Sequence, residues 1–266
     1  MKIAVLGGGT MGEAIVKSIL RKKLAGSEDI VISDVAKSRR DVINNRYKVK
    51  VTEDSLAAIK GADVIILAIK PQDFPAILAQ LAGRLKSQLV ISIAAGIGLE
   101  AICSGLNYYK VVRAMPNTPA QVGKGMTAWT SAKDLSAKDR EIAGSILAAM
   151  GEEQYFTDEK YIDMATAISG SGPAYVFLFI EAMIDAGVHI GLPRNVATKL
   201  VVETIVGSAE AMKKMAKHPA ELKNMVTSPG GTTTDALLQL ESGGLRSLMI
   251  NAVAAAYNKA KSLGAK

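Results

Sequence analysis

The sequence predicts an α/β domain with a doubly wound, mostly parallel sheet, followed by an all-α segment. Short apolar runs alternate with helical patterns through the first half of the chain, as in repeated βαβ units. These runs are nearly continuous in Val, Ile and Leu, which is typical of strands buried on both faces. From residue 158 onward only helical spacing occurs. We therefore expect one domain over residues 1–157 and a second, helical domain over residues 158–266.

In the first half, apolar runs of strand type alternate with helical spacing as far as residue 85, and further strands follow. The expected strands are Lys2–Leu6, Asp29–Ser33, Val49–Val51, Asp63–Ile69, Leu89–Ile93, Tyr109–Ala114, Met126–Thr130 and Glu153–Phe156. The expected helices are Met11–Leu20, Arg39–Tyr47, Ser55–Lys60, Phe74–Leu85 and one running from the N-cap Ser136 to about Met150. Sheets of this kind bind ligands beyond the carboxyl ends of their strands, so functional residues are expected just after Leu6, Ser33, Ala68 and Ser92.

The second half is unusually apolar for its length. Ser171 is a candidate N-cap with Pro173 in the first turn, and the segment Ala174–Ile184 is apolar on nearly all sides. Further helices are expected from Pro193 to about Lys217, from Pro219, and from about Gly244 to Ser262. A helix that is apolar all round must be buried. We therefore predict that this half packs against a second subunit in an obligate homodimer.

Composition and charge exclude several classes. The net charge of +7 is spread over scattered Lys and Arg residues, so no nucleic-acid partner is expected. The single Cys103 fits a reducing compartment and a buried thiol, and a cytoplasmic location is expected. The longest uncharged run, Met164–Ile180, contains Gly170, Gly172 and Pro173, so neither a membrane span nor a membrane partner is expected.

A glycine-rich loop follows the first strand and opens the first helix. Its residues Gly7, Gly8, Gly9, Thr10, Met11 and Gly12 satisfy G-x-G-x-x-G, which in this context predicts a dinucleotide-binding, Rossmann-like domain. The first glycine permits the tight turn, the second lets the backbone approach a pyrophosphate, and the third lets the helix pack close to the strand. Free N–H groups at the helix start would face the anion; the alternative is a glycine-rich turn without a ligand.

The end of the second strand bears on the choice of cofactor. Asp34 is suited to a ribose 2′-hydroxyl and thus to NAD, whereas Ser33 with nearby Lys37, Arg39 or Arg40 is suited to the 2′-phosphate of NADP. The residues alone leave both possibilities open.

Three further loops lie at the same predicted edge of the sheet. Pro71 keeps Lys70 extended, where the lysine would approach the cofactor or remain an ordinary exposed residue. Small residues follow the fifth strand and would admit a flat nicotinamide ring, or simply fit a tight turn. Two prolines stiffen the loop around Asn117. The candidate cofactor residues on these loops are Ala68, Ile69, Lys70, Pro71, Ala94, Ala95 and Asn117.

The helical half contains a second candidate anion site, in the sequence SPGGTTTD. Pro229, Gly230 and Gly231 end one helix, and Thr232, Thr233 and Thr234 begin the next. A helix start offers free N–H groups and the positive end of the helix dipole, which suits a carboxylate; an N-cap with spare threonines is the alternative. Glu181, Asp185 and His189 share one helix face, but we interpret them as a polar seam at an interface and expect no metal.

Seven segments together resemble pyrroline-5-carboxylate reductase across essentially the whole chain. They are Gly7–Gly12, Ala68–Pro71, Met115–Pro119, Ser169–Tyr175, Gly191–Arg194, Ser228–Thr233 and Glu241–Arg246. The resemblance implies reduction of 1-pyrroline-5-carboxylate to L-proline by hydride transfer from NAD(P)H, the last step of proline synthesis. It also implies a helical dimerisation domain and, in many members, an assembly of five dimers.

Carried over by position, the resemblance assigns roles to individual residues. The substrate carboxylate and ring nitrogen would be held by Ser228, Gly231, Thr232 and Thr233, with Thr233 hydrogen-bonded to the imine nitrogen. Glu159 and Ser169 would lie near the substrate, and Ser33 near the ribose phosphate. The resemblance favours NADP, with NAD as the alternative. The pair Asp34-Val35, where many members carry Asn or Arg, and Ser55 depart from the family pattern.

Two other functions share parts of this layout. A β-hydroxyacid dehydrogenase would carry a Lys and an Asn in the helical half, at positions that Val176 and Ile180 occupy here. A non-catalytic NADP-binding regulator would not need the second anion site. The mechanism implied by the resemblance requires mainly proximity and orientation of hydride donor and imine.

Overall fold

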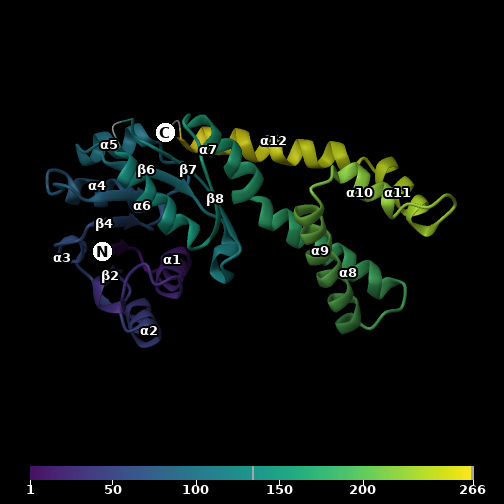
Figure 1. Cartoon of the computed structure of the whole chain (residues 1–266), viewed down its shortest axis with the longest axis horizontal. Helices are drawn as coiled ribbons and strands as arrows, with labels where there is room; N and C mark the ends of the chain where they lie inside the picture. Colours follow the sequence, from purple (N-terminus) through teal and green to yellow (C-terminus); the bar gives the residue numbers. More distant parts are fainter. Residues whose placement is uncertain (134, 265–266) are drawn as a thin grey trace. The chain divides into compact units, whose positions relative to one another are not determined.

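The computed structural model describes residues 1–133 and 135–264 and contains two compact units (Figure 1). The first unit comprises residues 1–171 together with the C-terminal segment from residue 255, and the second comprises residues 172–254. This division by compactness follows the packing of the chain, and it places the helical segment 158–171 with the first unit.

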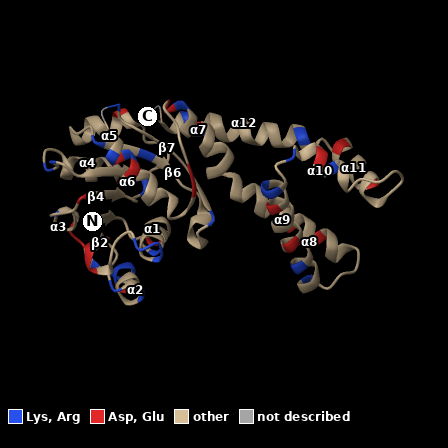
Figure 2. Cartoon of the chain, viewed as in Figure 1, with Lys and Arg blue, Asp and Glu red and all other residues tan. Residues whose placement is uncertain are grey.

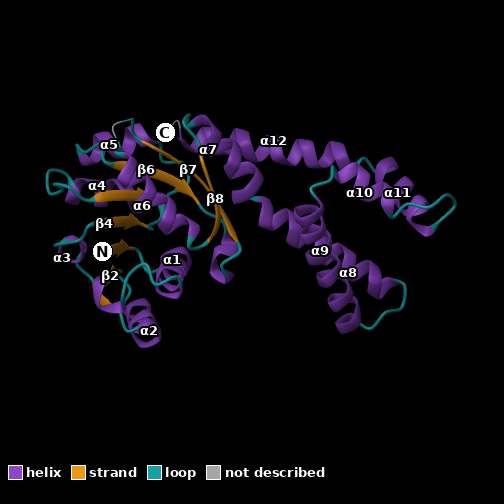
Figure 3. Cartoon of the chain, in the orientation of Figure 1, coloured by secondary structure: helices purple, strands orange, loops and turns teal. Residues whose placement is uncertain are grey.

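An eight-stranded sheet forms the centre of the first unit within the described residues, in the order β3-β2-β1-β4-β5-β6-β7-β8 (Figure 3). Its strands are β1 (Ile3–Leu6), β2 (Ile30–Ser33), β3 (Lys50–Thr52), β4 (Val64–Leu67), β5 (Leu89–Ser92), β6 (Val111–Met115), β7 (Gly125–Ser131) and β8 (Gly151–Tyr155). All neighbouring pairs are parallel except β6 with β7. The short connection between those two strands allows only an antiparallel return, because parallel pairing needs a longer crossover. The predicted α/β fold is confirmed.

Helices cover both faces of the sheet. The helices α1 (Thr10–Arg21), α2 (Lys37–Tyr47) and α6 (Ala137–Ala148) bury Ile15, Ile43 and Ile146 in one apolar cluster. On the other face, α3 (Ser55–Ile59), α4 (Phe74–Leu81) and α5 (Leu99–Leu106) bury Ile59, Phe74 and Ile102. Each fully buried side chain of this size contributes about 1.5–3 kcal/mol. The two clusters hold the strand ends in place, and short 3₁₀ turns at Ser27–Asp29, Pro71–Asp73 and Thr118–Val122 complete the connections.

The helix α7 (Lys160–Ala165) continues through a π-helical segment, η4 (Thr166–Gly170), into α8 (Gly172–His189). Ser171 directly precedes α8, where the N-cap was expected, but its backbone angles are helical (φ −84°, ψ −22°) and its N–H donates to the carbonyl of Thr166 at 2.8 Å. It therefore continues the preceding turn, whereas an N-cap residue has an extended backbone. The wider π turn lets the helix pass Gly170, Gly172 and Pro173 without a break.

This continuity also removes the reason for which a membrane span was not expected. In the described part of the chain, Lys160–His189 is long and apolar enough to cross a membrane by length and composition. The core helix of a globular protein meets the same criteria of length and composition.

The second unit is helical, as expected. It consists of α8, α9 (Arg194–Met215), α10 (Pro219–Met225), α11 (Thr232–Ser242) and the first half of α12 (Leu245–Gly264). Gly187 lets α8 approach α9 closely, because a Cβ there would lie 3.0 Å from that of Ala197. Long stretches of α8 and α12 carry no charged side chain (Figure 2). Large apolar side chains exposed on this unit include Phe177, Leu178, Leu200, Val206, Leu238, Leu248 and Ile250.

Candidate functional site

The glycine-rich loop connects β1 to α1 with three glycines in different environments. Gly7 has a φ of +103°, and a Cβ there would lie 2.4 Å from the carbonyl oxygen of Ala68. A Cβ at Gly12 would lie 2.0 Å from the carbonyl oxygen of Gly7. Gly9 differs, because no atom lies within 4 Å of its would-be Cβ and it precedes α1 without a side-chain cap. The uncapped helix start therefore faces open space, and this geometry fits the diphosphate of a dinucleotide.

Asp34, directly after β2, is bonded to this loop. One carboxylate oxygen accepts from the Gly8 N–H at 2.7 Å, and the other accepts from the Ala36 N–H at 2.8 Å. The preceding Ser33 is 3% exposed, and its hydroxyl lies 3.2 Å from that of Ser55. Asp34 thus lies half-buried at the corner between β2 and α2, whereas the Ser33 side chain is buried.

Two arginines of the same corner are held by internal contacts. Arg39 donates to the Gly8 carbonyl at 2.8 and 2.6 Å and pairs with Glu13 at 2.6 Å. Arg40 donates to the carbonyls of Asp34 and Val35 and pairs with Glu53. Their guanidinium groups therefore brace the loop and the start of α2.

Glu13 anchors α1 to α2. Burial alone would raise the pKa of the Glu13 carboxyl, but hydrogen bonds from Arg39, Arg46 and Tyr47 outweigh burial and lower the pKa below its usual value. The carboxylate is thus ionised at neutral pH, and it ties α1 to three side chains of α2, of which Arg39 also bonds the glycine-rich loop.

The other predicted loops follow β4, β5 and β6, whose carboxyl ends lie at the same edge of the sheet. Lys70 is exposed and extended, as Pro71 predicts, and the carbonyl of Ala68 borders Gly7. Ala94 is buried, and its N–H donates to the Ser92 hydroxyl.

Asn117 is engaged within the first unit. Its amide donates to the Ser169 carbonyl at 3.0 Å and accepts from the Met126 N–H at 2.9 Å. The Ser169 hydroxyl donates to the Ala165 carbonyl at 3.0 Å. Asn117 thus fixes the π-helical segment that carries Ser169 against the edge of the sheet.

A buried ionic cluster centres on Arg113 of β6, and sequence reasoning did not identify it. The Arg113 side chain is 5% exposed and bonds Glu159 and Asp163, each at 2.7 Å. The same Glu159 oxygen accepts from the Leu99 N–H, at the start of α5, at 2.7 Å. An arginine inside the apolar strand Val111–Met115 was the available signal, because a buried charge requires partners.

The second anion site lies in the second unit and is built around a tight turn. The Gly231 N–H donates to the Ser228 carbonyl at 3.1 Å across Pro229 and Gly230, and Gly230 has a φ of +67°. A type II turn has this pattern. The Thr234 hydroxyl donates to the same Ser228 carbonyl at 2.8 Å.

This turn leaves the start of α11 without a side-chain cap. Neither Thr232 nor Thr233 makes a side-chain hydrogen bond within the described residues. Two hydroxyls and several N–H groups are thus available together, a combination that suits a carboxylate with a neighbouring polar atom.

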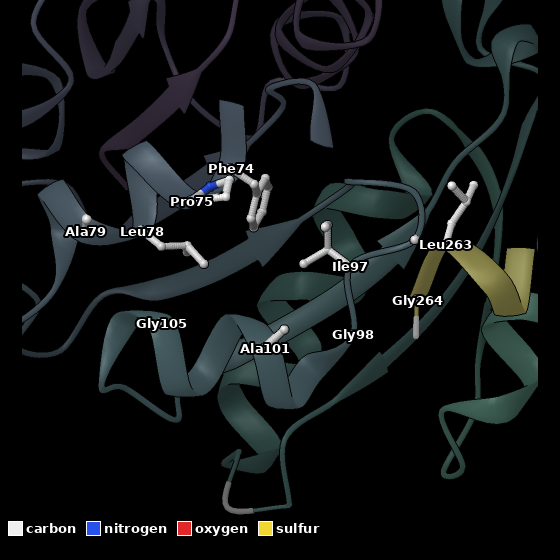
Figure 4. Close-up of a pocket in the computed structure, with 11 residues that line it drawn as sticks. Phe74, Pro75, Leu78, Ala79, Ile97, Gly98, Ala101, Gly105, Leu263 and Gly264 are labelled. Carbon is white, nitrogen blue, oxygen red and sulfur yellow. The ribbon is translucent and has the colours of Figure 1, made fainter. Parts of the chain in front are cut away.

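A separate hollow of about 420 Å³ lies beyond the β5–α5 loop in the first unit (Figure 4). Figure 4 shows apolar side chains of α4, this loop, α5 and the end of α12 around it, among them Phe74, Leu78, Ile97, Ala101 and Leu263. Its lining residues carry no polar side chain, which distinguishes it from the hydroxyl-bearing site at the start of α11. Among the described residues, no group of three His, Cys, Asp or Glu side chains is placed to hold a metal.

Comparisons with known families and sequences agree over the whole chain. Residues 159–263 match the family model "Pyrroline-5-carboxylate reductase dimerisation", and residues 2–96 match "NADP oxidoreductase coenzyme F420-dependent". A pyrroline-5-carboxylate reductase of Synechocystis sp. is 43% identical, with 100% of this chain and 99% of that protein covered. The Escherichia coli (strain K12) enzyme of the same name is 35% identical, with 98% of each chain covered.

Solved structures agree with these matches. The pyrroline-5-carboxylate reductase of Coxiella burnetii has a TM-score of 0.91 at 34% identity, covering 98% of both chains. The Plasmodium falciparum pyrroline carboxylate reductase with NADP bound has a TM-score of 0.91 at 33% identity, covering 99% of this chain and 98% of that one.

Proposed function

The chain belongs to the pyrroline-5-carboxylate reductase family, and from that premise we propose how its residues carry out the reaction. It is an NAD(P)H-dependent oxidoreductase that reduces 1-pyrroline-5-carboxylate to L-proline in proline biosynthesis, and it uses NADP(H).

We propose that residues 1–157 bind the dinucleotide and residues 158–266 supply the substrate site and the dimer contacts. The N–H groups at the start of α1, opened by Gly9, hold the diphosphate. The loops after β2, β4, β5 and β6 hold the ribose and nicotinamide, through Ser33, Asp34, Ala68–Pro71, Ala94, Ala95 and Asn117. When bound, the reduced nicotinamide supplies the hydride.

The substrate is proposed to bind at the start of α11. The N–H groups of Thr232 and Thr233, just beyond Gly231, and the Ser228 hydroxyl hold its carboxylate, because this helix start is uncapped. The Thr233 hydroxyl orients the imine nitrogen by a hydrogen bond. A threonine is too weak an acid to protonate an imine freely, so the residue's contribution is orientation and a relay of protons from water.

Glu159 and Ser169 are proposed to lie beside the substrate ring. The ion pair with Arg113 and the hydrogen bond from Leu99 fix the Glu159 carboxylate, and Asn117 fixes the backbone of Ser169. Groups held in this way need no reorganisation while the protonated imine accepts the hydride, which is the condition for electrostatic stabilisation.

The chain self-associates through its helical half, which matches the dimerisation model over residues 159–263. We propose that the unit is a homodimer in which the apolar faces of α8 and α12 are buried, and that five dimers assemble further. Burial of α8 between subunits explains its apolar composition without a membrane, and we propose a cytoplasmic location. No nucleic-acid partner is proposed.

The reaction is tested by the consumption of NADPH. The purified chain is expected to oxidise NADPH in the presence of 1-pyrroline-5-carboxylate and to form L-proline, identified by mass. The same protein is incubated with β-hydroxyacids and NADP⁺ as the control for the alternative dehydrogenase. Turnover of a hydroxyacid without formation of proline would contradict the assignment, and binding of NADP⁺ without any turnover would favour the regulator.

Replacement of Thr233 tests the substrate site. Thr233→Ala is expected to lower kcat/KM for the imine by about 10- to 1000-fold, the effect of losing one preorganised hydrogen bond. Thr233→Ser, which keeps the hydroxyl, is the matched control and should retain most activity. Unchanged kinetics in Thr233→Ala would exclude the proposed role.

A further inference from the structure

The corner between β2 and α2 carries a fixed negative charge. Both oxygens of Asp34 accept backbone N–H groups, from Gly8 at 2.7 Å and from Ala36 at 2.8 Å. These bonds hold the carboxylate against the glycine-rich loop, and they use only part of its capacity, because an ionised carboxylate has about four acceptor positions. The remaining positions are available to a ligand.

The neighbouring cations do not neutralise this carboxylate. The Arg39 guanidinium pairs with Glu13 and the Gly8 carbonyl, and Arg40 pairs with Glu53 and two backbone carbonyls. Lys37, at the start of α2, is exposed and makes no ion pair among the described residues. Lys37 is therefore available to bind a phosphate group, unlike the two paired arginines.

The position of Asp34 decides what it meets in a dinucleotide. In sheets of this type, the acidic residue after the second strand faces the 2′ position of the adenosine ribose. A 2′-hydroxyl would donate a hydrogen bond to the carboxylate, whereas a 2′-phosphate would place like charges side by side, which is unfavourable.

We propose that Asp34 sets the discrimination between the two nicotinamide cofactors in this chain. It favours the 2′-hydroxyl of NADH and weakens the binding of the 2′-phosphate of NADPH, so that the enzyme uses both. This inference rests on the proposed dinucleotide site, and it names the residue that lowers the preference for NADPH.

The test compares the binding of NAD⁺ and NADP⁺ by titration calorimetry. In Asp34→Asn the ratio of dissociation constants, NADP⁺ over NAD⁺, is expected to fall by about 10- to 100-fold relative to the wild type. Asparagine has a single acceptor oxygen, so Asp34→Asn loses one of the two bonds from backbone N–H groups. The resulting disturbance of the loop affects both cofactors alike, and it therefore cancels in the ratio of the dissociation constants. The ratio of kcat/KM values with 1-pyrroline-5-carboxylate should shift in favour of NADPH to a similar extent.

Asp41→Asn is the matched control. Asp41 is an exposed acid of α2 that makes no ion pair among the described residues, so the variant changes the net charge equally without touching the corner. Its cofactor ratio should match the wild type. Asp34→Ser provides a second variant if Asp34→Asn is unstable, since a serine hydroxyl can still accept a backbone N–H.

Two outcomes would overturn the proposal: a ratio unchanged in both Asp34 variants, or an equal shift in Asp41→Asn. Wild-type protein that binds both dinucleotides but does not reduce 1-pyrroline-5-carboxylate would contradict the proposed reaction and leave the binding result for Asp34 intact.

Discussion

At the residue scale, Gly9 and Gly12 lie in one loop but are required for different reasons. Gly12 packs against the backbone of the first unit, so a side chain there has no room. Gly9 faces open space and has an ordinary φ of −67°, so the fold itself accepts a side chain. We therefore expect that binding of the ligand requires a glycine at position 9, whereas folding requires a glycine at position 12.

This difference gives a paired prediction. Gly12→Ala is expected to lower the free energy of unfolding by about 1–3 kcal/mol, because its Cβ would collide with the Gly7 carbonyl. Gly9→Ala should stay within about 1 kcal/mol of the wild type yet weaken dinucleotide binding at least about 10-fold, since a methyl group would block the approach of the diphosphate. Denaturant unfolding and calorimetry measure the two effects separately, and tight NADP⁺ binding by Gly9→Ala would contradict the proposed site.

At the element scale, the Arg113 cluster joins three elements of the first unit. Arg113 belongs to β6, Glu159 and Asp163 to the start of α7, and Leu99 to the start of α5. The cluster therefore fixes the β5–α5 loop and α7 relative to the sheet. A buried arginine of this kind contributes little net stability compared with apolar packing, but removing it leaves two carboxylates without their partner.

Arg113→Ala is accordingly expected to lose about 3–5 kcal/mol of unfolding free energy. Arg113→Lys, which keeps the charge but cannot bond both carboxylates through a planar fork, should lose less. Urea unfolding measures the free energy of unfolding of both variants, and an unchanged slope m shows that a shift of the midpoint reports stability. A wild-type midpoint for Arg113→Ala would show that the cluster does not stabilise the fold.

At the scale of the whole molecule, the apolar surface of the second unit requires a partner. Phe177 and Leu178 of α8 are 62% and 67% exposed in the single chain, and large apolar areas on a protein surface mark interaction sites. The match of residues 159–263 to a dimerisation model identifies self-association as the means of burial.

Phe177→Glu is expected to prevent dimer formation, because a charge would be buried in the interface without a partner. Size-exclusion chromatography with light scattering should show monomer or aggregate in place of the wild-type species. Val122→Glu, at an exposed position of the first unit, is the control and should assemble normally. A normal assembly of Phe177→Glu would exclude α8 from the interface.

The sequence by itself determined the alternation of strands and helices, the glycine-rich loop after β1 and the helix start at Thr232. Each is set by residues within a few positions of one another, through side-chain periodicity and the turn preferences of glycine and proline. The short helix α5 escaped the same reasoning, because eight residues carry too little periodic pattern. The residues that form the candidate sites were therefore largely identifiable from local motifs.

Only the tertiary structure decided which groups bond across the fold. It assigned both Asp34 oxygens to backbone N–H groups, placed Arg39 on Glu13, surrounded Arg113 with two carboxylates, and carried the helix through Ser171 by a π turn. These contacts join residues far apart in the chain, or depend on backbone geometry that many sequences share. Local patterns determine which elements form, whereas the partners of a charged side chain depend on how those elements pack.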